Sequence, residues 1–198
     1  MYTVRSHRSQ EGFTLVELLL IIVVLGIAAA TLTMVSARSA ELSANMLRQQ
    51  QATTLAHALL EEVRNMPFTY CDPSNLPLAT TANSTAACGA GIDAMGPEVG
   101  EQRLPPPAAL RFDHVNDYNG FVAPAGSLRD VAGNLMTADL PTVANCRVSV
   151  AVANQAVIDV APGDAVRIAV TVQCPEAQGP SVVAEAVRIR YAPNRAEF

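Results

Sequence analysis

An uncharged apolar run near the N-terminus constrains this chain more than any other feature of its sequence. From Leu18 to Ala37, 20 consecutive residues carry no charge. Twenty helical residues span roughly 30 Å, which is the thickness of a bilayer's hydrocarbon core. Arg5 and Arg8 precede the run. Because basic flanks are retained in the cytoplasm, we expect the rest of the chain to cross the inner membrane.

Three interpretations of this run compete. A secretory signal peptide has a basic start, an apolar core and small residues at a cleavage site, here near 35–37. A plain single-span anchor needs only the apolar run. The third interpretation depends on Glu17, which lies within the apolar stretch that begins at Phe13. A carboxylate in a membrane span costs a few kcal/mol on insertion, so it indicates a function and needs a partner.

The composition of the whole chain excludes some classes of protein. The 198 residues suit one domain, or one domain with an appended element. A net charge of −5 argues against nucleic-acid binding, which needs a basic face to neutralise phosphates. Hydrophobic residues make up 50% of the chain, which argues against wholesale disorder.

The residues before and within the apolar run form a recognisable motif. Gly12, Phe13 and Glu17 follow a short Arg-containing leader at fixed spacing. This stretch resembles the prepilin cleavage and methylation motif of type IV pilins and type II secretion pseudopilins. The resemblance implies that a membrane prepilin peptidase cuts between Gly12 and Phe13 and N-methylates the new amine of Phe13. Residues 1–12 are then the leader, and residues 13–198 the mature protein.

The resemblance also gives Glu17 a partner. Cleavage creates a cationic amine at Phe13 inside the membrane, and two buried opposite charges are far better paired than alone. The resemblance implies that Glu17 pairs with the Phe13 amine of a neighbouring subunit during filament assembly. Without such a partner, Glu17 would be a tolerated, protonated side chain.

One long helix is expected after the leader. Nothing breaks a helical pattern from Phe13 until Pro67, which predicts about 54 residues of continuous helix ending at Met66. We expect 13–38 to be its transmembrane half and 39–66 its amphipathic half. The apolar positions expected to share the packed face are Leu42, Met46, Thr53, Ala56, Leu60 and Val63.

The remainder of the chain divides into an irregular part and a strand-rich part. Residues 67–145 are rich in Pro and polar residues, which predicts a loop-rich variable region with short strands. Residues 146–198 are expected to form a small antiparallel β-sheet and a C-terminal tail, with a turn at 161–164 and strands at 146–153, 166–174 and 182–191. The expected fold class is therefore α+β and type IV pilin-like, with the long helix packed on this sheet.

The four cysteines allow three disulfide connectivities. If the first two strands form a hairpin, Cys146 lies opposite Cys174, in the register that also pairs Val148 with Val172. The same register pairs Val150 with Val170. We therefore favour Cys71–Cys88 with Cys146–Cys174, in a periplasmic domain where oxidation is expected. A zinc site is disfavoured because the chain has no Cys-x-x-Cys pair.

Candidate chemical sites are few. Asp113, Asn116 and Asp117 lie close together around His114 and could gather oxygen ligands for calcium. They lack EF-hand spacing, so we expect a solvated acidic loop and no metal. His57 is expected to be merely exposed or packed on the helix. No nucleophile–base set or phosphate-binding loop is evident, so we expect no catalysis and no cofactor.

Scattered motifs narrow the resemblance further. The segments 58–63, 96–103 and 112–120 are similar to MshD-type minor pilins of the mannose-sensitive haemagglutinin (MSHA) pilus. This resemblance implies a structural subunit that joins other major and minor pilins through the pilus assembly platform, either priming assembly or occupying the tip of the cell-surface filament. Two alternatives remain open. One is a type II secretion pseudopilin, and the other is a pilus-associated adhesin whose 67–145 loops bind a ligand.

Overall fold

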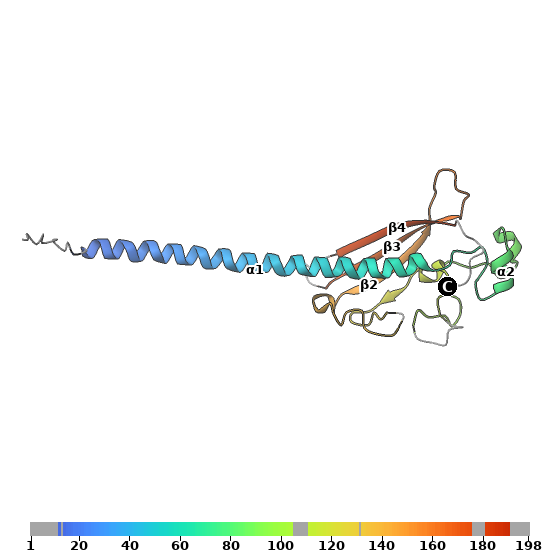
Figure 1. Cartoon of the computed structure of the whole chain (residues 1–198), viewed down its shortest axis with the longest axis horizontal. Helices are drawn as coiled ribbons and strands as arrows, with labels where there is room; N and C mark the ends of the chain where they lie inside the picture. Colours follow the sequence, from blue (N-terminus) through green and yellow to red (C-terminus); the bar gives the residue numbers. More distant parts are fainter. Residues whose placement is uncertain (1–11, 13, 105–110, 131, 176–180, 191–198) are drawn as a thin grey trace, which may run out of the picture. The chain divides into compact units, whose positions relative to one another are not determined.

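The protein is described from a computed structural model, which covers residue 12 and residues 14–104, 111–130, 132–175 and 181–190. The chain divides into two compact units, residues 1–44 and 45–198. The second unit holds a four-stranded antiparallel sheet with the C-terminal part of the long helix α1 packed on it (Figure 1). The predicted α+β, type IV pilin-like arrangement is confirmed.

Helix α1 spans Leu15–Asn65, which is 51 residues. It begins two residues later than predicted, and Phe13 lies outside the described residues. It ends just before Pro67, because a proline disfavours helical geometry in the residue that precedes it. The backbone N–H of Val115 donates to the Pro67 carbonyl at 3.1 Å, so the chain leaving the helix is tied to the loop region.

The packed face of α1 is shorter than predicted. Its fully buried residues begin at position 52 and are Ala52, Leu55, Ala56, Leu59, Leu60 and Val63. The prediction for Leu42 and Met46 was wrong, because these side chains are 64% and 66% exposed. Thr53 is only half-buried. Apolar periodicity predicts which face of a helix is buried, but it does not predict where the packing partner ends.

The sheet has the order β1-β2-β3-β4, and each neighbouring pair is antiparallel. Its strands are β1 (Val122–Ala123), β2 (Arg147–Asn154), β3 (Ala165–Gln173) and β4 (Ser181–Ile189). The predicted register is confirmed, because Val148 pairs with Val172 and Val150 with Val170. Strand β4 ends at Ile189, short of the predicted limit of 191, which lies outside the described residues.

One face of this sheet and the C-terminal part of α1 share a single hydrophobic core. The inward side chains of β2 and β3 stand at even-numbered positions, among them Val148, Val150, Val170 and Val172. Valine suits these positions because its branched side chain packs well on a pleated surface. Each fully buried side chain of this size contributes about 1.5–3 kcal/mol relative to an exposed one.

The loop region 67–145 contains more helix than predicted. It holds α2 (Leu76–Thr81) and the 3₁₀ turns η1 (Thr85–Cys88), η3 (Val115–Tyr118) and η4 (Pro141–Val143). Helix α2 was missed because Pro77 was interpreted as a helix breaker. Proline in the first turn of a helix is tolerated, because the N–H that it lacks has no partner there.

Two disulfides cross-link the second unit. Cys71 is bonded to Cys88, with their Cα atoms 5.3 Å apart. Cys146 is bonded to Cys174 across the ends of β2 and β3, with a Cα separation of 4.1 Å. No cysteine is left free. The first bridge lies in a small apolar cluster of its own, separate from the main core.

A buried ion pair connects the loop region to α1. The Arg103 guanidinium donates two hydrogen bonds to the Glu62 carboxylate, at 2.7 and 2.6 Å. The Tyr118 hydroxyl donates to the same carboxylate at 2.7 Å. The side chains of Arg103 and Glu62 are only 5% and 13% exposed. A bidentate pair in this setting fixes both the position and the orientation of Arg103 and the loop residues next to it.

Candidate functional site

The segment that carries the cleavage motif begins outside α1. Gly12 is exposed and precedes the first helical residue, Leu15. Its two chain neighbours apart, no described residue has a heavy atom within 4 Å of the point where a Cβ on Gly12 would stand. Phe13 and residues 1–11 of the predicted leader lie outside the described residues. Gly12 itself therefore lies outside the helix and is exposed.

Glu17 lies in the first turn of α1. Its backbone N–H donates to Thr14 Oγ1 at 3.3 Å, and the Leu18 N–H donates to the Thr14 carbonyl at 3.1 Å. Thr14 therefore caps the helix, and Glu17 stands at the third helical position, where a carboxylate is favoured by the unpaired N–H groups of the helix N-terminus. The Glu17 side chain is exposed, so a group from another molecule can reach it.

The first half of α1 is long and apolar enough to cross a membrane. Its most apolar 18-residue window has a mean hydropathy of 2.8, and none of that window is buried in the structure. Leu18, Ile22 and Leu25 are each more than half exposed. A continuous apolar surface of this size needs lipid or other helices around it.

A second candidate site surrounds η3. The prediction of a solvated acidic loop here was wrong, because His114 and Asp117 are fully buried and Asn116 is 7% exposed. Asp117 Oδ2 accepts hydrogen bonds from the backbone N–H groups of Asp113, at 2.9 Å, and His114, at 2.7 Å. The bond from His114, together with the backbone N–H that the His114 side chain accepts in return, forms a capping box that holds the acidic side chain inside the turn.

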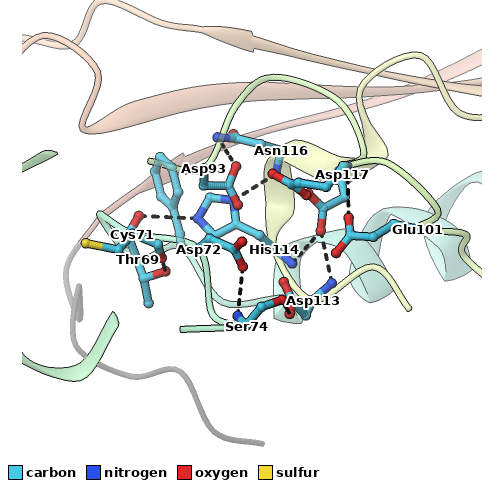
Figure 2. Close-up of polar contacts among 12 residues, drawn as sticks. Thr69, Cys71, Asp72, Ser74, Asp93, Glu101, Asp113, His114, Asn116 and Asp117 are labelled. Carbon is cyan, nitrogen blue, oxygen red and sulfur yellow. Dashed lines mark hydrogen bonds and ion pairs between the residues drawn. The ribbon is translucent and has the colours of Figure 1, made fainter. Parts of the chain in front are cut away.

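His114 joins this turn to two other segments (Figure 2). Its Nε2 lies 3.3 Å from the Thr69 carbonyl oxygen. Its Nδ1 lies 2.9 Å from Asp93 Oδ2 and 3.2 Å from the Asn116 backbone nitrogen. A neutral ring protonated at Nε2 accepts the Asn116 N–H, whereas a protonated ring donates to Thr69 and Asp93. Both forms keep the buried ring hydrogen-bonded.

Five carboxylates converge on this turn. The carboxylate oxygens of Glu101, Asp113 and Asp117 lie within 4.8 Å of one another, and Asp117 also forms such a group with Asp93 and Glu98. The structure therefore brings together Asp113 and Asp117 from the predicted calcium candidates. Asn116 has another role, since its side-chain nitrogen donates to Asp93 Oδ1 at 2.9 Å.

The electrostatics of the cluster favour protonated carboxyls. Burial, with the nearby charge of Asp93 second, raises the pKa of Asp117 to about 9. Burial and a hydrogen bond with Glu98 raise the pKa of Glu101 to about 8. Burial, with Asp72 second, raises the pKa of Asp113 to about 6. At neutral pH, the ionised forms of Asp117 and Glu101 are therefore unfavourable in this structure, whereas Asp113 is mostly ionised.

Three buried oxygens among the described residues accept no hydrogen bond. They are Asp117 Oδ1, Asn116 Oδ1 and Asp93 Oδ2, the last of which faces His114 Nδ1. Leaving a buried polar atom without a partner costs about 1–3 kcal/mol. Because Asp93 Oδ2 has the His114 ring beside it, Asp117 Oδ1 is the buried carboxylate oxygen of the cluster that most clearly lacks a partner.

Sequence reasoning missed part of this site. Glu98 and Glu101 lie in the Gly- and Pro-containing segment 96–103, and Asp93 lies further upstream. Because they are far from η3 in the sequence, their proximity to it in the fold was not predicted. The dense acids of 93–101 could have been grouped with those of 113–117, since both segments lie between the long helix and the first predicted strand.

Comparisons with known proteins bear on the N-terminal segment only. Residues 7–33 match the family described as the prokaryotic N-terminal methylation motif. No curated protein and no solved structure matches the chain significantly. The motif, together with the apolar helix that follows it, supports a type IV pilin-like protein that is processed by prepilin peptidase and associates with a membrane or a pilus.

Proposed function

We propose that this chain is a minor pilin of an MSHA-type type IV pilus. The observation that carries the pilin-type part of the proposal is Glu17, an acidic residue in the first turn of an apolar helix that begins shortly after a prepilin-type Gly-Phe sequence. The MSHA part is supported by the similarity of segments 58–63, 96–103 and 112–120 to MshD-type pilins. A signal peptide or a simple anchor has no use for this carboxylate, which is costly in a membrane. The role proposed is structural.

The proposed processing takes place at the inner membrane. Prepilin peptidase cuts between Gly12 and Phe13 and N-methylates the Phe13 amine. The exposure of Gly12 and its position before α1 support this step, because a peptidase needs a peptide that is not held in a helix. Residues 1–12 remain in the cytoplasm, and the second unit lies in the periplasm. Its two disulfides suit that oxidising compartment.

The proposed assembly step joins Glu17 to the Phe13 amine of a neighbouring pilin. The exposed side chain of Glu17 is available for this contact. Pairing is favoured because each charge is costly alone in the bilayer, and apolar packing of neighbouring helices covers the rest of the exposed surface of the span. The pilus assembly platform then extrudes the subunit into a filament at the cell surface.

The experiment compares two glutamates of the same helix. Glu17→Gln and the control Glu41→Gln are produced in a strain that lacks the native copy, and sheared pili are tested for the protein. Glu41 is also exposed but lies outside the apolar run. We expect Glu17→Gln to be processed but depleted from pili, and Glu41→Gln to be incorporated normally. Normal incorporation of Glu17→Gln would contradict the assembly role.

The phenotype of a deletion strain separates the pilus from the other systems that use this N-terminus. Loss of surface pili, with secretion of enzymes unchanged, is the expected result. Loss of secreted enzymes, with pili intact, would instead identify a type II secretion pseudopilin. Intact pili that no longer attach to cells would identify an adhesin.

A further inference from the structure

Asp117 is held in a fixed orientation through one of its two oxygens. Oδ2 accepts the backbone N–H groups of Asp113 and His114, whereas Oδ1 accepts no hydrogen bond although the side chain is fully buried. A buried carboxylate with one oxygen clamped and the other unpaired lacks a positive partner. This unpaired oxygen is the observation that distinguishes the cluster from an ordinary group of surface acids.

The two other carboxylates of the group are also oriented. Glu101 Oε2 accepts the backbone N–H of Glu98 at 3.1 Å, and Asp113 Oδ2 accepts the Ser74 hydroxyl at 3.2 Å. Figure 2 shows Glu101, Asp113 and Asp117 converging from two segments of the loop region. Hydrogen bonds of this kind hold metal-binding carboxylates in position before the ion arrives.

The charged groups that act on Asp117 are mostly acidic. The charges that raise its pKa belong to Asp93, Glu101 and Glu98. The cationic form of His114 pairs with Asp93. Because Asp93 faces the His114 ring and already accepts from Asn116, the group formed by Glu101, Asp113 and Asp117 is the better ligand set of the two.

We propose that Glu101, Asp113 and Asp117 bind a calcium ion on the loop region of this protein. The ligands are carboxylate oxygens alone, which suit a hard cation and not zinc or copper. They come from irregular segments, and calcium tolerates such flexible geometry better than magnesium does. Glu101 and Asp113 are half-buried, so the ion can enter from solvent and complete its coordination with water.

Calcium binding would link two parts of the loop region. Glu101 lies two residues before Arg103, whose ion pair with Glu62 attaches this segment to α1. Asp117 lies in the turn η3, and Asp113 lies two residues before it. The ion would therefore hold together the two ends of the segment 101–117, and would stabilise the folded protein by binding it in preference to the unfolded chain.

The test uses the full chain in nonionic detergent, freed of metal with a chelator and then dialysed. Calcium binding is measured by isothermal titration calorimetry on the wild type, Glu101→Gln and Asp113→Asn. The control is Glu185→Gln, which removes an exposed carboxylate on β4 that belongs to neither group. Asp117 is left unchanged because it also caps η3. Circular dichroism of each variant checks that the fold is kept.

We expect one calcium site per chain with a dissociation constant of about 10⁻⁴–10⁻³ M, the range of extracellular calcium modules. Glu101→Gln and Asp113→Asn should each weaken binding about tenfold or more, and Glu185→Gln should leave it unchanged. Binding should weaken at pH 5.5, because the ligands must lose their protons. The proposal is overturned if the wild type does not bind calcium, or if folded Glu101→Gln and Asp113→Asn variants bind calcium like the wild type. It is also overturned if the wild type binds magnesium with the same affinity as calcium.

Discussion

Replacement of Arg103 by methionine should destabilise the second unit strongly. The guanidinium makes two hydrogen bonds to Glu62, donates a third to the Arg129 carbonyl at 2.5 Å and lies 5.5 Å from the centre of the Phe121 ring. Removing one member of a buried ion pair costs about 3–5 kcal/mol, because the other charge is left without compensation. The Glu62 side chain is only 13% exposed, so solvent screens little of the charge that is left after the substitution.

The assay is thermal unfolding of the full chain in detergent, followed by near-ultraviolet circular dichroism of the tyrosines. In a unit of this size, each kcal/mol lowers the midpoint by about 2–4 °C, so Arg103→Met should lower it by about 6–20 °C. The control is Arg167→Met. Its ion pair with Glu185 is 3.4 Å long and both side chains are about half exposed, so its loss should cost less than about 1 kcal/mol.

The double substitution Glu62→Met with Arg103→Met tests the reason for the effect. It removes both charges and leaves neutral groups without their partners, chiefly the Tyr118 hydroxyl and the Arg129 carbonyl, so it should destabilise less than Arg103→Met alone. If the double variant lost as much stability as the two single changes added together, an uncompensated charge would not be the cause. A loss below about 1 kcal/mol in Arg103→Met would refute the reasoning altogether.

Three further predictions concern stability. Replacing Cys146 and Cys174 by serine should cost about 3–4 kcal/mol in denaturant titrations, because the bridge closes a loop with a sequence separation of 28; an unchanged midpoint would contradict this. Leu59→Ala should cost about 2–5 kcal/mol in the same titrations, whereas Met46→Ala, at an exposed position, should cost less than about 0.5 kcal/mol. In a solution with a chelator, the protein should lose stability as the pH rises from about 4 towards 9. The unfolded chain releases the Asp117 proton near pH 4, whereas the folded chain keeps it until about pH 9, so deprotonation favours unfolding in between. Thermal midpoints that rise over this interval would contradict the prediction.

The strands and the helix could be predicted because their patterns are local. Alternation in β2 and β3, with a cysteine at each outer end, fixes a register that pairs Val148 with Val172. The length of α1 follows from the absence of a helix breaker before Pro67. The extent of its packing could not be predicted, because Leu42 continues the apolar periodicity at a position that is exposed in the structure.

The acidic site could be predicted only in part. Asp113 and Asp117 are close in the sequence and are recognisable as possible oxygen ligands for calcium, but the expectation from the sequence is a solvated loop without a metal. Their burial could not be foreseen, because a short polar segment is normally solvated unless its side chains cap a turn, as Asp117 does. Glu101 is twelve residues before Asp113 in the sequence, and only the folded structure places their carboxylate oxygens within 4.8 Å of each other.

The most direct test of a pilin-type subunit is the N-terminus of the protein made in cells that contain a prepilin peptidase. The intact mass and the N-terminal sequence of the membrane-extracted chain are measured together. We expect a chain that begins at Phe13 and carries one additional methyl group. A chain that begins near Arg38 would instead show removal of a signal peptide, and an uncut Met1 would show a simple anchor. Either result would contradict the proposed processing and the assembly role of Glu17.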